Sequence, residues 1–287
     1  MRADLHVHSN ASDGTDTPAE VMHRAARAGL DAVALTDHDT VAGHAEARRS
    51  LPDGLTLVPG MELSCRLDDR SLHLLAYLFD PEHPELAEQT RLIRDDRVLR
   101  ARAMVRRLAD LGAAVTWDQV AAIAGTAVVG RPHIARAMAA SGVVATPADA
   151  FTSDWIADGG RAYVAKYALD PSRAIRLVRA AGGAAVLAHP RAAREGGRGG
   201  GWAVPDQRIA ALAAAGLAGV EVFHPDQSRA KRAGLLALAR DLGLVATGGS
   251  DDHGSLTGHR IGVETTPADA YETLLAQATG AQPIRHG

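Results

Sequence analysis

The sequence of 287 residues contains little cysteine, few aromatic side chains and no long apolar run. Its single cysteine, Cys65, excludes an intrachain disulfide framework and favours a reducing, cytoplasmic location. No run of 18 apolar residues is present, which excludes a membrane-spanning helix, and no signal peptide is visible. We therefore expect a cytoplasmic protein without a membrane partner.

The sequence also has no large excess of positive or negative charge. The net charge is −3, so the chain has no basic signature for bulk nucleic acid. Aromatic residues make up only 3%, so there is no stacking run for a long single strand, and the core must be built from Ala, Val and Leu. Cys65 follows a hydrophobic run, which favours a buried small residue over a nucleophile.

Strand-like and helix-like stretches alternate along most of the chain. The helix at 17–28, for example, opens with Thr17 and Pro18 and closes at Gly29. Such alternation predicts βα units and a mainly parallel sheet. The strands are predicted at 5–8, 31–38, 55–65, 72–79, 184–190, 219–225 and 244–253, and the helices between them at 17–28, 41–49, 172–181, 206–215 and 229–242.

The connection between the third and fourth strands breaks this pattern. Only residues 66–71 separate them, whereas a parallel crossover needs about a dozen residues or more. We therefore expect an antiparallel hairpin here, which makes Glu62 and His73 neighbours.

A second break lies between Pro81 and about Gly160, where the spacing is helical throughout. We predict an α/β fold in which residues 1–82 and 162–287 form a barrel and residues 83–161 form an inserted helical subdomain. The Gly-rich stretch 195–202 is predicted to be a solvent loop, with a lid over the site as the alternative.

Histidines and carboxylates gather at the predicted strand ends. His6 and His8 point to one face of the first strand, because residues i and i+2 share a face. A single strand-end histidine is usually only hydrogen-bonded, but many of them beside carboxylates at one barrel rim would be costly to bury without cations. Imidazole and carboxylate suit Mn, Fe or Zn. The strand ends supply His6, His8, Asp37, His38, Glu62, His73, His189, Glu221, His224, Asp251, Asp252 and His253.

Some polar residues have a more ordinary explanation. Asp37 and Asp252 adjoin stronger candidates, and either orient histidines or serve as turn residues. The remaining histidines are expected in helices or loops, away from any metal: His23, His44, His83, His259 and His286.

Six segments resemble the motifs of the PHP (polymerase and histidinol phosphatase) family. They are "DLHVHSNASDG", "ALTDHDTVAG", "GMELSC", the His in "SLHLLAYLFD", "VLAHP" and "GGSDDHG", which run from residue 4 to 254. The resemblance implies a distorted seven-stranded, TIM-like (β/α)7 barrel and a metal-dependent phosphoesterase. "GGAAVLAHP", "GRPHIA" and the helical insertion resemble the branch that acts on nucleoside monophosphates or 3',5'-bisphosphates.

The same resemblance implies a ligand set for two to three divalent ions. Carried over residue by residue, the first ion is held by His6, His8, Glu62 and Asp251, the second by Asp13, His38 and His253, and the third by Glu62, His73 and His189. Asp13, His38, Glu62 and His253 are expected to serve catalysis through the ions. A hydroxide bridging two ions would attack the phosphorus in line.

Positive side chains are expected to hold the rest of the phosphate. Arg131 and His133 of "GRPHIA" are candidates, since guanidinium binds phosphate in a bidentate manner. The alternative for Arg131 is a cap or an ion pair on the helix surface. His224 could bind phosphate or protonate the leaving oxygen, or form a core hydrogen bond. The run 91–107 contains seven arginines, and a solvated face is favoured. Arg91 and Arg94 lie three residues apart, as do Arg97 and Arg100, so some of these arginines could point into a cleft.

Four functions remain open from the sequence. A phosphatase of small nucleotides is favoured. The alternatives, in order, are a 5'→3' exonuclease on short oligoribonucleotides, a histidinol phosphate phosphatase and a metal-binding module without catalysis. The complete ligand set argues against the last. The expected partner is a small phosphorylated substrate, and the sequence predicts no oligomeric state.

Overall fold

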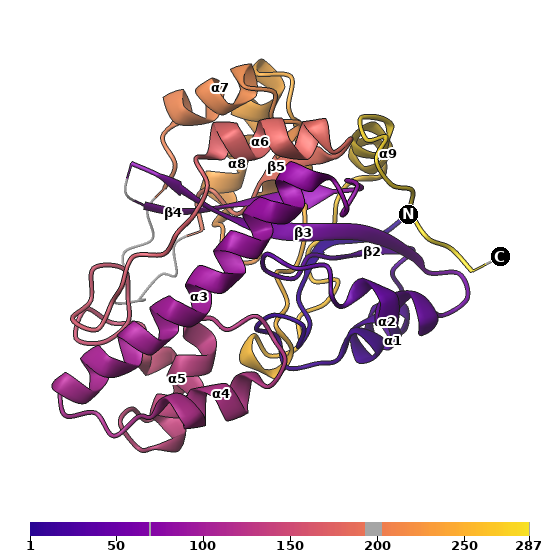
Figure 1. Cartoon of the computed structure of the whole chain (residues 1–287). Helices are drawn as coiled ribbons and strands as arrows, with labels where there is room; N and C mark the ends of the chain where they lie inside the picture. The colour runs from indigo at the N-terminus through magenta and orange to yellow at the C-terminus, as the bar shows by residue number, and fades with distance from the viewer. Residues whose placement is uncertain (69, 193–202, 287) are drawn as a thin grey trace.

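The computed structural model describes residues 1–68, 70–192 and 203–286. Seven strands form one sheet in chain order, β1 to β7, and helices surround it (Figure 1). The ends of the sheet meet, because Val7 at the end of β1 bridges Asp252 beyond β7. The strands are β1 (Ala3–Val7), β2 (Ala32–Leu35), β3 (Thr56–Leu67), β4 (Arg70–Tyr77), β5 (Ala184–Leu187), β6 (Gly219–Phe223) and β7 (Val245–Gly248). The predicted seven-stranded barrel is confirmed.

Strand β4 is antiparallel to both of its neighbours, and the other strand pairs are parallel. The predicted hairpin between β3 and β4 is therefore confirmed. Its register pairs Ser64 with His73, so Glu62 lies two residues further along the same face of β3. The side chains still meet: His73 Nδ1 lies 2.8 Å from Glu62 Oε1.

The helices outside the insertion are α1 (Pro18–Arg27), α2 (His44–Arg49), α6 (Pro171–Ala180), α7 (Asp206–Ala214), α8 (Arg229–Asp241) and α9 (Ala268–Ala276). Two short 3-10 turns are η1 (Pro147–Ala150), which lies within the insertion, and η2 (Gly254–Leu256), which follows β7. α1 begins with a capping box, in which Thr17 and Glu20 satisfy each other's backbone N–H groups. The prediction missed α9, started α2 three residues early, and ran the last strand to 253 although it ends at Gly248.

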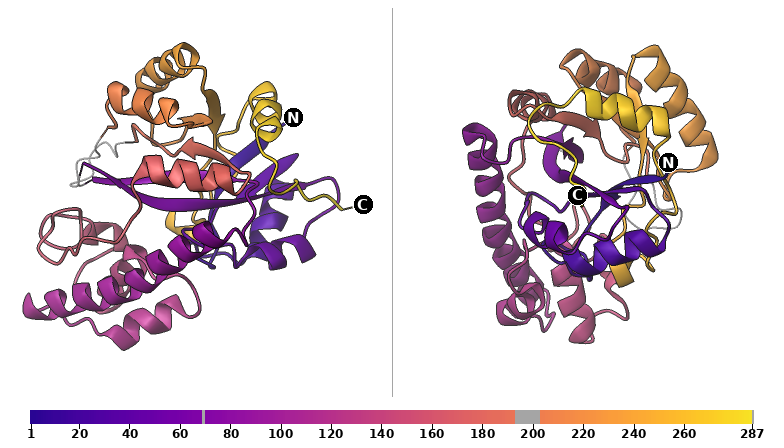
Figure 2. Two further views of the ribbon diagram at one scale, coloured as in Figure 1. Left: turned by 45° about the horizontal axis from the view of Figure 1, so that its top comes forward. Right: turned by 90° about the vertical axis from the view of Figure 1, so that its right-hand side faces the viewer.

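The inserted helices are α3 (Pro84–Asp110), α4 (Trp117–Ala124) and α5 (Arg131–Ala140). Figure 1 shows α3 leaving the barrel and carrying α4 and α5 at its far end, and the left view of Figure 2 shows the same arm from another side. Leu86 and Ile93 of α3 pack in the barrel core with α6, whereas Met104 and Leu108 pack with α4 and α5. α3 thus belongs to both cores, and the predicted boundaries at 83 and 161 stay a prediction.

Three sequence expectations concern single segments. Cys65 is fully buried, and burial raises the pKa of its thiol, so the buried small residue is confirmed. The predicted loop at 195–202 lies outside the described residues. Across the described part of the chain, no helix is long and apolar enough to cross a membrane.

Candidate metal centre

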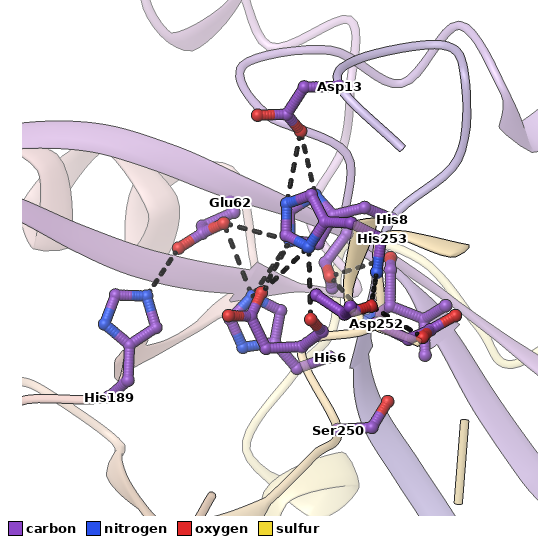
Figure 3. A network of polar contacts seen from close by, with 12 residues as sticks. His6, His8, Asp13, Glu62, His189, Ser250, Asp252 and His253 are labelled. Atoms are coloured by element: carbon purple, nitrogen blue, oxygen red, sulfur yellow. Dashed lines mark hydrogen bonds and ion pairs between the residues drawn. The ribbon is translucent and has the colours of Figure 1, made fainter. Parts of the chain in front are cut away.

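The first strand brings two imidazoles together at one end of the barrel. His6 and His8 are fully buried, and their Nε2 atoms lie 3.1 Å apart. Glu62 Oε2 lies 3.3 Å from His6 Nε2 and 3.1 Å from His8 Nε2. Asp251 Oδ1 lies 3.4 Å and 3.3 Å from the same two atoms. Four donor atoms, from β1 and the residue after it, from β3 and from the segment after β7, therefore lie close together. Figure 3 shows His6, His8 and Glu62 of this group.

These separations fit a divalent cation. Two donor atoms that each lie about 2.1 Å from one ion are about 3.0 to 3.4 Å apart. Buried carboxylates and imidazoles at this spacing would be costly without a positive charge between them. Imidazole with carboxylate is a donor set of Mn, Fe and Zn. Glu62, which is 1% exposed, has no access to water as a substitute partner.

A second group shares His8 with the first. Asp13, on the loop after β1, has Oδ1 3.3 Å from His253 Nε2 and Oδ2 3.7 Å from His38 Nε2. Within the described part of the chain, His8 Nδ1 has no hydrogen-bond partner, and it lies 3.8 Å from Asp13 Oδ1. An unpartnered buried nitrogen facing a carboxylate and two further imidazoles is the arrangement that a second ion would complete.

Glu62 connects the first group to a third. Its Oε1 lies 2.8 Å from His73 Nδ1 and 3.1 Å from His189 Nε2, while its Oε2 lies 3.2 Å from His38 Nδ1. The two oxygens of this carboxylate thus face different sets of imidazoles. Such a carboxylate is suited to bridge two ions. His38, Glu62 and His73 form the third compact donor group.

The protonation states of Glu62, His38 and Asp13 agree with this view. Burial raises the pKa of Glu62, but the neighbouring His38 and His73 outweigh burial and hold that pKa well below its usual range. Burial lowers the pKa of His38 to about 3, which leaves its imidazole neutral. Burial also raises the pKa of Asp13, but His38 and His253 lower it well below its usual range. Ionised carboxylates and neutral imidazole are the forms that bind metal.

Glu221 of β6 supports two members of this centre, and sequence reasoning assigned it no role beyond its place at a strand end. Its Oε1 lies 2.9 Å from His6 Nδ1, and its Oε2 accepts a hydrogen bond of 2.7 Å from the backbone N–H of His189. A carboxylate on the far nitrogen of a ligating imidazole fixes the ring and its tautomer. The sequence feature that could have identified Glu221 was its position on the inward face at the end of a predicted strand.

Asp37 and Asp252 act as turn residues. Asp37 accepts hydrogen bonds from the backbone and hydroxyl of Ser9 and from the hydroxyl of Ser12, which shapes the loop that carries Asp13. Asp252 accepts from the Thr257 hydroxyl and from backbone N–H groups beyond β7. Among the other histidines, His44 Nε2 lies 2.8 Å from the carbonyl oxygen of Gly60.

Several residues at the strand ends adopt the left-handed backbone region that L-residues rarely occupy. His189 has φ 27°, Asp251 φ 49° and Asp39 φ 55°. Each lies directly at, or next to, a candidate ligand. Such conformations persist where the surrounding contacts enforce them, and they concentrate at functional sites.

The three predicted substrate-binding residues have different surroundings. Arg131 lines the cavity beside the centre, with its guanidinium 2.7 Å from Asp158 Oδ1. His133 Nδ1 accepts a hydrogen bond from the Gly130 N–H at the start of α5. His224 Nδ1 accepts from the Asp226 N–H, so its Nε2 carries the proton and faces Asp251 Oδ2 at 3.4 Å. Both histidines bond to protein groups, and their predicted contact with substrate stays a prediction.

A cavity of about 360 Å³ lies between the metal centre and the insertion. Its barrel side carries Asp13, His38, His73, Asp251 and His253, and its insertion side carries Arg97, Arg100, Arg131, Phe151, Tyr163 and Lys166.

The favoured solvated face for the arginine run is wrong for two of its members. Arg97 and Arg100 are each 7% exposed and line the cavity, whereas Arg91 pairs with Glu88 and Asp95 on the surface. Sequence reasoning missed Lys166, which lies in an irregular segment with no motif. It is half-buried, and its ammonium lies 3.0 Å from Ser64 Oγ and 3.3 Å from His73 Nε2.

Comparisons with known proteins agree with this geometry. A family model described as the PHP domain matches residues 4–97. A 5'-3' exoribonuclease of Haemophilus influenzae is 34% identical over 254 residues, which are 87% of this chain and 89% of the relative. A 3',5'-nucleoside bisphosphate phosphatase of Chromobacterium violaceum is 33% identical, over 90% of this chain and 89% of the relative.

Two further proteins extend the comparison. A phosphoribosyl 1,2-cyclic phosphate 1,2-diphosphodiesterase of Eggerthella lenta is 32% identical, over 88% of this chain and 95% of the relative. The crystal structure of a protein described as a metal-dependent phosphoesterase, from Bifidobacterium adolescentis, has a TM-score of 0.88 and 34% identity, with 96% of each chain covered. The resemblance in the sequence motifs is thereby confirmed, and the chain belongs to the PHP family of metal-dependent phosphoesterases.

Proposed function

We propose that this phosphoesterase removes phosphate from phosphomonoesters of small nucleotides, of the nucleoside monophosphate or 3',5'-bisphosphate type. The observation that carries the proposal is a wall of cations that faces the metal centre across the cavity. In the same proposal, two to three ions of Mn, Fe or Zn are held by nine side chains. They are His6, His8, Asp13, His38, Glu62, His73, His189, Asp251 and His253.

The cationic wall consists of Arg100, Arg131 and Lys166. Burial and the nearby Arg131 lower the pKa of Arg100 to about 10. Burial and the charge of Arg97 lower the pKa of Lys166 to about 7. Several positive charges therefore lie close together at this side of the cavity. A phosphate group separate from the one being hydrolysed would neutralise them, and guanidinium and ammonium both bind phosphate well.

Size and the remaining lining favour a nucleotide over a small sugar phosphate. The cavity of about 360 Å³ lies within the range of about 300 to 1,000 Å³ of small-molecule sites. Phe151 and Tyr163 line it, and the Arg131 guanidinium lies 5.8 Å from both ring centroids. Pro132, Ala135, Pro147, Ala148 and Leu256 complete an apolar surface suited to a flat base.

The residues of the centre divide the work of hydrolysis. When bound, the ions supply a water nucleophile at neutral pH and neutralise the phosphoryl oxygens. Asp13, His38, Glu62 and His253 hold them beside the cavity, and Asp13, His38 and His253 also line it. His224 donates from Nε2 to Asp251 and so keeps this carboxylate aligned with His6 and His8.

The experiment measures phosphate release from AMP, adenosine 3',5'-bisphosphate, a 5'-phosphorylated dinucleotide and histidinol phosphate, each with Mn and with EDTA. The expected result is Mn-dependent release from the first two compounds, with kcat/KM higher for the bisphosphate because of its second phosphate. His8→Ala removes a shared member of two donor groups and should abolish release.

Other products would overturn the proposal in defined ways. Release of mononucleotides from the dinucleotide, without phosphate release from AMP or the bisphosphate, would identify an exoribonuclease. Turnover of histidinol phosphate alone would identify that phosphatase. Lack of turnover of every compound by fully metal-loaded protein would exclude this substrate class.

A further inference from the structure

Asp39 follows the candidate ligand His38 and is fully buried. It adopts φ 55°, and its backbone N–H donates a hydrogen bond of 3.0 Å to the carbonyl oxygen of Glu62. The residue thus joins the turn after β2 to the middle of β3, between two candidate ligands. Aspartate tolerates a left-handed backbone better than most residues, but here the conformation must still be enforced by contacts.

Two arginines of the inserted helix α3 provide those contacts. Arg97 donates to Asp39 Oδ2 from Nε at 2.8 Å and from NH2 at 2.6 Å. Arg94 donates from NH1 to the Asp39 carbonyl oxygen at 2.9 Å. The side chain and the backbone of Asp39 are therefore both hydrogen-bonded to α3.

Ser64 of β3 completes the network. Its backbone N–H donates to Asp39 Oδ1 at 2.7 Å, and its hydroxyl donates to Oδ2 at 2.8 Å. The same hydroxyl accepts hydrogen bonds from Arg97 at 2.9 Å and Lys166 at 3.0 Å. Ser64 lies opposite His73 in the β3–β4 register, so the network reaches a second candidate ligand.

Arg97 lines the cavity, but its charge is already matched by a buried carboxylate. Burial raises the pKa of Asp39, and the Arg97 guanidinium outweighs burial and lowers it below its usual value. A guanidinium bound through two of its nitrogens in this way is fixed in place. This arginine differs from Arg100, whose Nε donates to the carbonyl oxygen of Val164.

We propose that Asp39 is a positioning residue for the phosphoesterase reaction, bound by Arg94 and Arg97 so that the inserted helix fixes the turn that carries His38. The insertion then has two separate tasks. Arg100, Arg131 and Lys166 face the substrate, whereas Arg94 and Arg97 hold the metal centre in shape. The proposal rests on the metal dependence of the family and not on the nucleotide substrate.

The test compares Asp39→Asn, Arg97→Met and Arg97→Lys with Arg91→Met. Asparagine keeps the size of the side chain and its tolerance of a left-handed backbone. Arg91 lies on the same helix and pairs with exposed Glu88 and Asp95, so it controls for loss of an α3 arginine. The measurements are bound metal per chain after dialysis against Mn, and kcat and KM on p-nitrophenyl phosphate and AMP.

The expected result for Asp39→Asn and Arg97→Met is a loss of close to one metal equivalent and a fall in kcat of about 10- to 100-fold, by the same factor on both substrates. KM should change less than about threefold, and Arg97→Lys should recover part of the metal. Arg91→Met should match the wild type. Full metal content with unchanged kcat, or a rise in KM alone for Arg97→Met, would overturn the proposal.

A second variant and the choice of metal content as a readout make the result interpretable. If Asp39→Asn does not fold, as judged by circular dichroism, Arg94→Met replaces it, because this change removes one hydrogen bond to the Asp39 carbonyl. Its expected effect is a smaller loss in the same direction, and unchanged metal and kcat would overturn the proposal. Metal content does not depend on the substrate, so failure of the nucleotide proposal leaves this test intact.

Discussion

The barrel rim and the inserted helices face each other across one cavity, but they are built in different ways. The rim carries imidazoles and carboxylates at the ends of strands, where each position follows from the course of the sheet. The facing side contributes cations from α3 and the start of α5 in the insertion, and from the irregular segment after it that carries Lys166. The difference suggests that the rim performs the chemistry and the insertion selects the substrate.

Removing the Glu62 carboxylate should produce the largest effect. Glu62→Gln takes a charge from a residue whose two oxygens face five imidazoles. We expect kcat to fall about a thousandfold or more, since Glu62 would hold the ions that, in the proposed function, supply the nucleophile. Glu88→Gln, on the exposed face of α3, is the matched control. If Glu62→Gln keeps its metal and turns over substrate at a near-normal rate, the barrel rim is not the site of hydrolysis.

Metal affinity should depend strongly on pH. Burial lowers the pKa of His8, but hydrogen bonds to Asp251 and Glu62 raise it to about 10, and Glu221 and Asp251 raise that of His6 despite its burial. The metal-free pair therefore carries protons near pH 7, and a bound ion must displace at least one. Raising the pH weakens this competition about tenfold per pH unit for each proton displaced, so the apparent association constant should rise at least about 100-fold from pH 6 to pH 8. Titration calorimetry of the metal-free protein with Mn would measure it, and a flat profile would contradict it.

Replacing Glu221, which contacts the candidate ligands His6 and His189, should have a smaller effect on kcat than replacing a ligand. Glu221→Gln weakens the contact with His6 Nδ1 and the bond to the His189 N–H. We expect kcat and metal affinity to fall about 10- to 100-fold, with KM little changed. Steady-state kinetics and metal analysis of the same preparation would check both. A rise in KM with full metal content would assign Glu221 to the substrate side.

On the insertion side, one change should improve binding. Asp158 is the ion-pair partner of Arg131 and also lines the cavity. Asp158→Asn releases the arginine and removes a negative charge, so KM for a nucleoside 3',5'-bisphosphate should fall about two- to fivefold. The exposed Asp154→Asn is the control. A higher KM would mean that Asp158 holds Arg131 in its binding position.

Much of the rim could be predicted from the sequence, because its geometry depends on residues close together in the chain. In a strand, residues two apart share a face, so His6 and His8 can be assigned to one site from their spacing alone. The hairpin that joins Glu62 to His73 follows from a connection too short for a crossover. The contact between Glu221 and His6 could not be predicted, because it depends on how far two strands are rotated around the barrel.

The insertion was harder to predict because one helix, α3, packs in two hydrophobic cores: that of the barrel and that of the inserted helices. Leu86 and Ile93 face the barrel core, whereas Met104 and Leu108 face α4 and α5. The apolar stripe of α3 therefore does not follow one face, and the run of arginines does not reveal that Arg97 is buried while Arg91 is exposed. Lys166 lies outside any periodic element, so only the folded chain brings it to His73.

The most direct test of this division is the ratio of kcat/KM for adenosine 3',5'-bisphosphate to kcat/KM for AMP, measured in the wild type and in Arg100→Met. Arg106→Met, an exposed arginine of the same helix, is the control. We predict that Arg100→Met lowers the ratio about tenfold or more, with AMP hydrolysis nearly unchanged, because a charged hydrogen bond to the second phosphate is lost. An equal fall for both substrates, or an unchanged ratio, would contradict the account.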